Sequence, residues 1–192
     1  MALKERILKF AKKNSQKMKS NLITIDDIAN VKPITPNNKN RAGQIILEVQ
    51  DLWFSKLLGA AFYDYIRSTS DNLDDLMDGC SFNDCSGNTR YQPGLKKVLV
   101  YLFWSRYVYD INVTDTPTGM VSKTRTDSEQ LSMGHLNNLS SNYETMAMNY
   151  FEQVRDYIMQ NKSQYPLFKG CLGHTTNIHP SIKGVKNNNL RR

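Results

Sequence analysis

The sequence predicts an all-α protein: a helical bundle with long central and C-terminal helices, a short extended or hairpin loop near residues 114–126, and extended basic terminal arms. Three apolar patterns carry this prediction. Residues 45–57 place apolar side chains at steps of three and four, which defines one face of a helix. Residues 95–111 are apolar nearly all round, which is typical of a helix covered by others. A narrower stripe predicts a final long helix and consists of Leu136, Leu139, Tyr143, Met146, Tyr150, Val154 and Tyr157.

The N-terminal third is expected to hold three helical segments. Residues 3–18 favour a short basic helix whose apolar side chains, on or near one face, are Leu3, Ile7, Leu8, Phe10 and Ala11. Thr24 and Asp27 have the spacing of a helix cap and its reciprocating acid, so a short helix is expected to run to Ala29. A linker over residues 33–40 then leads to a helix over about 41–58.

Gly59 is expected to end that helix in the left-handed conformation. A helix over about 60–68 would then return Phe62, Tyr65 and Ile66 to the same core. After it we expect an irregular polar segment over 69–92, a helix over about 94–111, a loop over 112–127 and a helix over about 128–161. Within the loop, residues 118–124 have the composition of a short extended or hairpin segment.

Composition and length predict a single globular domain. The chain has 192 residues, 40% of them hydrophobic, with a mean hydropathy of −0.54. Its longest apolar run, Val98–Trp104, is far shorter than the roughly 20 residues that a bilayer requires, so no membrane partner is expected. The charged N-terminus lacks the apolar core of a signal peptide, and three cysteines do not form a disulfide framework, so synthesis in a cytosol is expected.

The net charge of +7 is unevenly distributed. Residues 1–19 carry +6, residues 160–192 carry +6 without a single acid, and the segment between them sums to −5. We therefore expect a basic helical arm over 1–20, a helical body over 21–168 and an extended basic arm over 169–192. An acidic body is not by charge a nucleic-acid-binding domain, although the arms could contact nucleic acid, bind an acidic partner or remain solvated.

No catalytic or metal-binding motif is complete, so neither an enzyme nor a cofactor is expected. A zinc site would need ligands at spacings unlike those of known motifs, drawn from Cys80, Cys85, Cys171, His174 and His179. Asp71, Asp74, Asp75 and Asp78 resemble a calcium loop, but Leu73 and Leu76 interrupt the ligand pattern, and a helix start is the simpler interpretation. A phosphate-binding glycine loop and a serine nucleophile elbow are both absent. A small hydrolase using Cys80, Cys85 or His135 is the enzyme alternative.

Four motifs, in this order, carry a resemblance to a known family. They are Gln44-x5-Gln50-x6-Leu57-Leu58-Gly59-x2-Phe62-Tyr63-Asp64, Pro93-Gly94-Leu95-Lys96-x2-Leu99-x-Tyr101, Thr116-x-Thr118-Gly119-Met120-Val121-x-Lys123 and Tyr165-Pro166-Leu167-Phe168. Over about residues 22–168 the chain resembles the head–tail connector (adaptor) proteins of tailed bacteriophages, in particular those of crAss-like phages. Both terminal arms lie outside the resemblance.

The resemblance implies a structural virion protein of the neck or tail, assembled in the cytoplasm of a bacterial host. Such a protein forms a ring, dodecameric in this family, below the portal protein; it extends the DNA channel and offers an attachment platform to further neck or tail proteins. DNA would pass without specific binding, which agrees with an acidic body. The alternative is a nucleic-acid-binding phage protein that uses its basic arms.

Two sets of residues are candidates for contacts with other subunits. The resemblance places the first in the ring interface: Thr116, Pro117, Thr118, Gly119, Met120 and Lys123. The second lies in the C-terminal arm, where aliphatic residues spaced between basic ones suit an extended peptide docked on the portal or a neighbour: Leu172, Ile178, Ile182, Lys183, Val185, Lys186, Arg191 and Arg192. A solvated tail is the alternative for this second set.

Overall fold

A computed structural model describes residues 21–69, 73–116, 119–122 and 132–169, with residues 113–122 described by their backbone alone. The expected arm over 1–20, with its helix over 3–18, lies outside these ranges, as does the expected arm over 169–192 except for Lys169. The first half contains α2 (Ile25–Ala29), η1 (Pro36–Asn38), α3 (Lys39–Val49), η2 (Gln50–Phe54), α4 (Ser55–Leu58) and α5 (Ala60–Ser68). The second half contains α6 (Asp74–Asp78), β1 (Cys80–Asn83), β2 (Thr89–Gln92), α7 (Leu95–Asp110), β3 (Val113–Thr116), β4 (Gly119–Ser122) and α8 (Met133–Gln160). The prediction of a mainly helical protein is confirmed, and two antiparallel hairpins are added to it.

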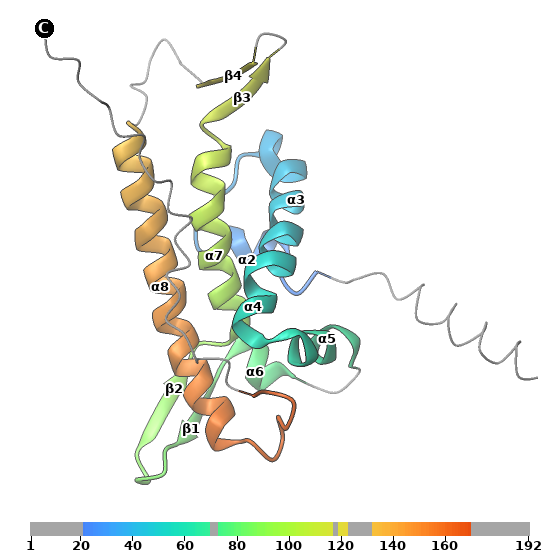
Figure 1. The fold of residues 1–192 in the computed structure, drawn as a ribbon. Coiled ribbons are helices and arrows are strands. Elements are labelled where there is room, and N and C mark those ends of the chain that lie inside the picture. Colours follow the sequence, from blue (N-terminus) through green and yellow to red (C-terminus); the bar gives the residue numbers. More distant parts are fainter. Residues whose placement is uncertain (1–20, 70–72, 117–118, 123–131, 170–192) are drawn as a thin grey trace, which may run out of the picture.

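The central helix α7 is covered on several sides, as its all-round apolar sequence predicts. It lies between the long helix α8 and the α3 segment, and α2 and α6 cover further parts of it (Figure 1). Leu95, Leu99 and Phe103 are completely buried. At one point on the α7–α8 contact the side chains are small: the Ser140 hydroxyl donates to the carbonyl of Ser105 over 2.8 Å. That bond satisfies a polar group at the point where the two helices approach.

The helix expected over 41–58 exists, but it is not uniform. α3 passes into η2, a π-helical segment of one turn, before α4 completes the run at Leu58. Gly59 then ends it with φ 78° and ψ 145°. Its φ is positive, as expected, but its ψ is extended rather than left-handed helical, which corrects the predicted cap and lets α5 start at once in a new direction. Phe62 and Ile66 are buried and Tyr65 packs against the core, as predicted.

Residues 69–92 are not an irregular segment, so that prediction is wrong. α6 begins at Asp74, and β1 pairs with β2 in the register Cys80 to Gln92 and Asn83 to Thr89. The chain enters this hairpin through Gly79 and leaves it through Gly94. The backbone packs so closely at both that a Cβ on Gly79 would lie 2.6 Å from the Gln92 carbonyl oxygen, and one on Gly94 would lie 2.4 Å from the Met77 carbonyl oxygen. Close backbone packing at the two glycines therefore holds this hairpin, and its strands cannot be predicted from an alternation of polar and apolar residues.

The buried stripe of α8 differs in phase from the predicted one. Leu136, Tyr143, Val154 and Tyr157 are buried as expected, whereas Met146 is 40% exposed. The residues that complete the buried face, at steps of three and four, are Ser140, Ala147, Phe151 and Ile158. Ser140 and Ala147 are small and only weakly hydrophobic, so a count of large apolar residues does not predict that they face the core.

The predicted cap at Thr24 is confirmed, and an aromatic contact that was not predicted closes the C-terminal end of the described body. Thr24 and Asp27 form a reciprocal capping box at the start of α2. After α8 the chain turns back, and Phe168 packs against Phe62 at 5.3 Å between ring centroids. Within the described residues, none of the helices is both long and apolar enough to cross a bilayer.

Trp104 tests the central role of α7. Its side chain is 6% exposed and its indole Nε1 has no hydrogen-bond partner among the described groups. Trp104→Ala is expected to lower the free energy of unfolding by about 3–5 kcal/mol because it opens a cavity. Trp104→Phe should cost less than half of that, because it keeps most of the volume and removes an unpaired donor. Urea titrations of both variants measure this, and a Trp104→Ala protein as stable as wild type would remove Trp104 from the core.

Asp84, in the turn that connects β1 to β2, gives a prediction for how the stability of the fold depends on pH. Bonds from the Asn88 and Ser86 amides, with the Arg90 guanidinium nearby, lower the pKa of this carboxyl from 3.8. A lowered native pKa means that the carboxylate stabilises the fold above pH 3.8 and that this contribution is lost as the pH falls through the lowered value. The stability difference between wild type and Asp84→Asn should therefore shrink between about pH 6 and about pH 2. The exposed Asp64→Asn is the control, and a difference independent of pH would contradict the assignment.

Candidate functional site

Three of the six predicted ring-interface residues, Thr116, Gly119 and Met120, lie on the β3–β4 hairpin. Thr116 ends β3 and pairs with Gly119, which starts β4, and Met120 pairs with Asp115. Pro117, Thr118 and Lys123 lie outside the described residues. The expected extended or hairpin segment is thus present as two paired strands, and its first strand starts at Val113, directly after α7.

The hairpin extends from the end of α7, beyond the neighbouring helix ends, as the top of Figure 1 shows. In the described part of the chain, each of its strands pairs with the other alone, so both outer edges are open. A two-stranded hairpin without a covering element is marginally stable in water. Its backbone therefore offers unpaired N–H and C=O groups to a further strand or chain.

Three polar contacts fix the base of this hairpin to the body. Asp110 at the end of α7 pairs with Arg41 of α3. The neighbouring Tyr109 hydroxyl donates to Asn137 of α8 over 2.9 Å. Asn112 then caps α7 by donating to the Val108 carbonyl over 2.6 Å. The hairpin is consequently attached to a base that α3, α7 and α8 hold in common.

The residues considered for catalysis are not brought together. His135 lies in the first turn of α8, exposed and beside Ser132. Cys80 contacts Tyr157 near the other end of the same helix, 22 residues further on, which is about 33 Å along an α-helix. Cys85 lies in the exposed turn beyond β1. No cysteine–histidine pair forms among the described residues, and Cys171, His174 and His179 lie outside them.

The acidic residues considered for calcium form part of α6 instead. Asp74 and Asp75 occupy its first turn and Asp78 its last, as the helix-start interpretation predicts, and Asp71 lies outside the described residues. The described residues contain no group of His, Cys, Asp or Glu that could hold a metal ion. α6 nevertheless contributes to an acidic surface that sequence reasoning did not identify.

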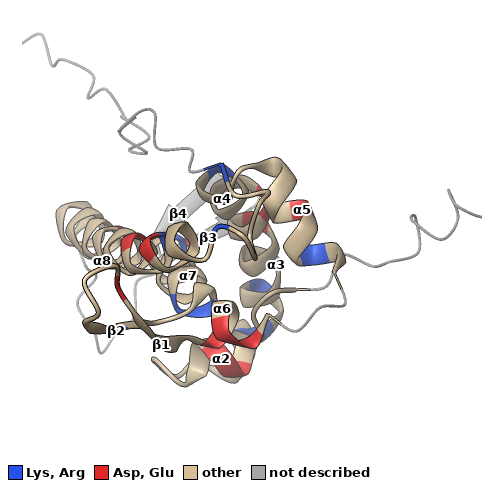
Figure 2. Cartoon of the chain, turned by 90° about the horizontal axis from the view of Figure 1, so that it is seen from below, with Lys and Arg blue, Asp and Glu red and all other residues tan. Residues whose placement is uncertain are grey.

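This acidic surface combines α2 and α6, which are coloured red at their acidic residues and lie close together in Figure 2. Lys96 of α7 lies among them: its ammonium bonds to Asp78 over 2.6 Å, and that bond, with Asp27 and Asp74 nearby, raises the Lys96 pKa. The surface consists of Asp26, Asp27, Asp74, Asp75 and Asp78.

A shallow pocket of about 230 Å³ opens beside the acidic surface. We call it the α5–α6 pocket, and its lining is Leu22, Ile66, Thr69, Leu73, Asp74, Met77, Asp78 and Lys96. Four of these side chains are apolar, while two carboxylates and one ammonium stand at its polar part. Because the lining comes from four separate segments, no single stretch of sequence predicts the pocket.

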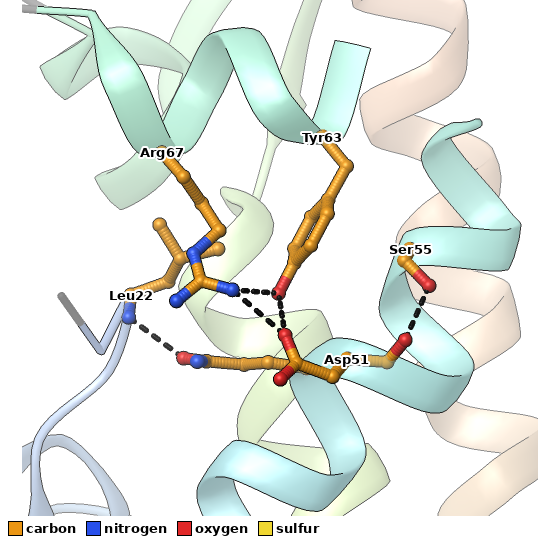
Figure 3. A network of polar contacts seen from close by, with 6 residues as sticks. Leu22, Asp51, Ser55, Tyr63 and Arg67 are labelled. Atoms are coloured by element: carbon orange, nitrogen blue, oxygen red, sulfur yellow. Dashed lines mark hydrogen bonds and ion pairs between the residues drawn. The ribbon is translucent and has the colours of Figure 1, made fainter. Parts of the chain in front are cut away.

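A polar network next to the pocket holds the chain at Leu22 (Figure 3). The completely buried Gln50 accepts the Leu22 amide through Oε1 over 2.7 Å. Arg67, whose side chain is 7% exposed, donates through Nη1 to Asp51 over 2.7 Å and to the Tyr63 hydroxyl over 2.9 Å. In the described structure, Nε and Nη2 of Arg67 have no hydrogen-bond partner.

The chemistry of this network is structural. The Tyr63 hydroxyl donates to Asp51 over 2.8 Å, and burial, followed by that bond, raises its pKa. A tyrosine with a raised pKa keeps its proton at neutral pH, so it does not act as a base or nucleophile. The network instead fixes η2, α5 and the start of the described chain relative to one another.

The described structure is that of a small, mainly helical protein with a covered central helix, a projecting hairpin and an acidic surface. The chain matches a family of unknown function, DUF6712, over residues 54–178. The match covers more than half of the chain, which therefore belongs to this family. It includes both hairpins, α7 and α8 and leaves out α2 and α3. Neither a curated protein nor a solved structure matches the chain.

The bond between Gln50 and Leu22 gives a prediction for the network. Gln50→Met preserves the shape of the side chain but removes the acceptor of the Leu22 amide. Loss of a hydrogen bond worth about 1–1.5 kcal/mol should speed hydrogen exchange at Leu22 by about tenfold. Leu52→Ala is the control, because Leu52 belongs to the same π-helical segment and is 51% exposed. Unchanged exchange at Leu22 in the Gln50→Met protein would show that the bond does not hold the chain there.

Proposed function

We propose that this protein is a structural subunit of a phage virion, a head–tail connector that forms a ring below the portal. One observation carries the proposal: the β3–β4 hairpin projects from the end of α7 with both edges open, while its base is fixed by contacts to α3 and α8. A rigidly based, otherwise uncovered hairpin suits pairing with a neighbouring subunit. The sequence resemblance to connectors supports the same role for the same segment.

The character of the body agrees with this role. A ring subunit needs a stable shape and contact surfaces rather than a reactive centre. The polar network of Asp51, Tyr63 and Arg67 contributes to such a shape, because it connects η2 to α5. The body is acidic, and five of its aspartates lie on the two short helices α2 and α6. Carboxylates near phosphates weaken DNA binding, so an acidic body suits a subunit past which DNA must move. The C-terminal arm from Lys169 is proposed to dock on the portal or a neighbour.

The hairpin is the part to alter. Replacing residues 114–126 by a short glycine linker should leave the subunit folded and abolish ring assembly, because the proposed contact edge is gone. The full-length chain would be co-expressed with the portal protein of the same genome, and rings counted by electron microscopy and native mass spectrometry. Tyr91→Ala is the matched control, because Tyr91 lies on the other hairpin and is 60% exposed.

Two outcomes would contradict the proposal. Normal rings from the linker variant would remove the hairpin from the interface. A wild-type chain that forms no ring with the portal, but binds DNA with an affinity that falls steeply with salt, would favour the nucleic-acid-binding alternative.

A further inference from the structure

We propose that the α5–α6 pocket and the acidic surface bind the basic N-terminal segment, residues 1–19, of the same chain. The proposal concerns the free subunit and does not depend on the connector role. The proposed ligand is residues 1–19, which lie outside the described residues. This segment is joined through the chain to the pocket, because Leu22 is part of the pocket lining.

The attachment point is the first argument. The Leu22 amide is held by the buried Gln50, so the preceding residues must leave the body at the edge of the pocket. Residues 19–21 join the expected helix over 3–18 to Leu22 and span about 10 Å when extended, which allows that helix to turn back onto the pocket. A tethered segment acts at a high effective concentration, so modest contacts suffice.

Charge complementarity is the second argument. Residues 1–19 carry +6, and in the described residues around the pocket three carboxylates surround one ammonium: Asp27, Asp74 and Asp78 around Lys96. The pairs would be only partly buried, so they contribute orientation and encounter more than affinity. The affinity must therefore come from apolar contact.

The apolar part of the pocket supplies that contact. Leu22, Ile66, Leu73 and Met77 form it, and its volume of about 230 Å³ is below the roughly 300–1,000 Å³ of typical small-molecule sites. A space of this size suits one or two anchoring side chains. The segment offers them on or near one face of its expected helix, in particular Ile7 and Phe10, with basic residues between and beside them.

Paramagnetic relaxation in the full-length chain tests the proposal. Cys80, Cys85 and Cys171 are replaced by serine, and a spin label is attached through Ala2→Cys. The amide signals of Ile66, Leu73 and Met77 are expected to lose most of their intensity, while those of α8 near Leu136 keep theirs. When isotope-labelled chain without the spin label is mixed with spin-labelled chain, the pocket signals should stay intact, because the contact is within one chain.

Two variants separate docking from general charge attraction. Ile7→Ser with Phe10→Ser keeps the charge of the segment and should restore the pocket signals. Asp74→Asn with Asp78→Asn should restore them as well, whereas Glu152→Gln with Asp156→Asn on α8 should not. The first variant lies outside the folded body, so it remains informative if the second is unstable.

The proposal is overturned if the label leaves the pocket signals unaffected, or if the loss appears equally in the mixed sample, which would mean that a second copy is the occupant. It is also overturned if the Ile7 and Phe10 variant loses signal as the parent does. Each measurement uses the subunit alone, so failure of ring assembly with the portal leaves the result unchanged.

Discussion

The burial of α7 is the constraint on which the rest of the structure depends. A helix that is apolar on every side cannot face water, so other elements must surround it. α8 and the α3 segment cover its length, and α2 and α6 cover parts that remain. This leaves the two ends of α7 as the places where the chain can vary without exposing the core. Both hairpins are attached there: β1–β2 precedes the first residue of α7, and β3–β4 follows its last turn.

The sequence predicted the elements whose stability is local. α7, α5, the capping box of α2 and the ends of the 41–58 helix follow from periodicity, glycine and capping side chains, which act over a few residues. The β1–β2 hairpin was missed because it depends on contacts between segments: the fully buried Gln92 accepts the Gly94 amide and donates to the carbonyl of Asp75 in α6. The phase of the α8 stripe was missed for a related reason: Ser140 faces the core and bonds to the backbone of Ser105 in α7, a contact between segments that local hydrophobicity does not predict.

The candidate sites likewise divide into one that local sequence predicted and one that depends on contacts between distant segments. The extended segment near 114–126 was predicted from a turn signal within a few residues, and the structure pairs it as β3 and β4. The acidic surface and its pocket could not be predicted, because Asp27, Asp74 and Lys96 are distant in sequence and α7 brings them together. A partial signal was available: both α2 and α6 begin with consecutive aspartates, which favour a helix N-terminus. What the sequence lacks is the information that the two helix starts are neighbours.

The separation of charge links the acidic surface to the proposed assembly. A subunit with strongly basic arms would bind nucleic acid indiscriminately in a cell, because the affinity of lysine-rich segments for phosphates needs no specific contact. Carboxylates on the body compete with phosphates for those lysines, and a tether at Leu22 gives them the advantage of proximity. In a ring, a neighbour or the portal could replace the body as the partner of an arm. If the arm docks as proposed and the protein is a connector, the same carboxylates would keep the arm from nucleic acid before assembly and weaken contact with DNA afterwards.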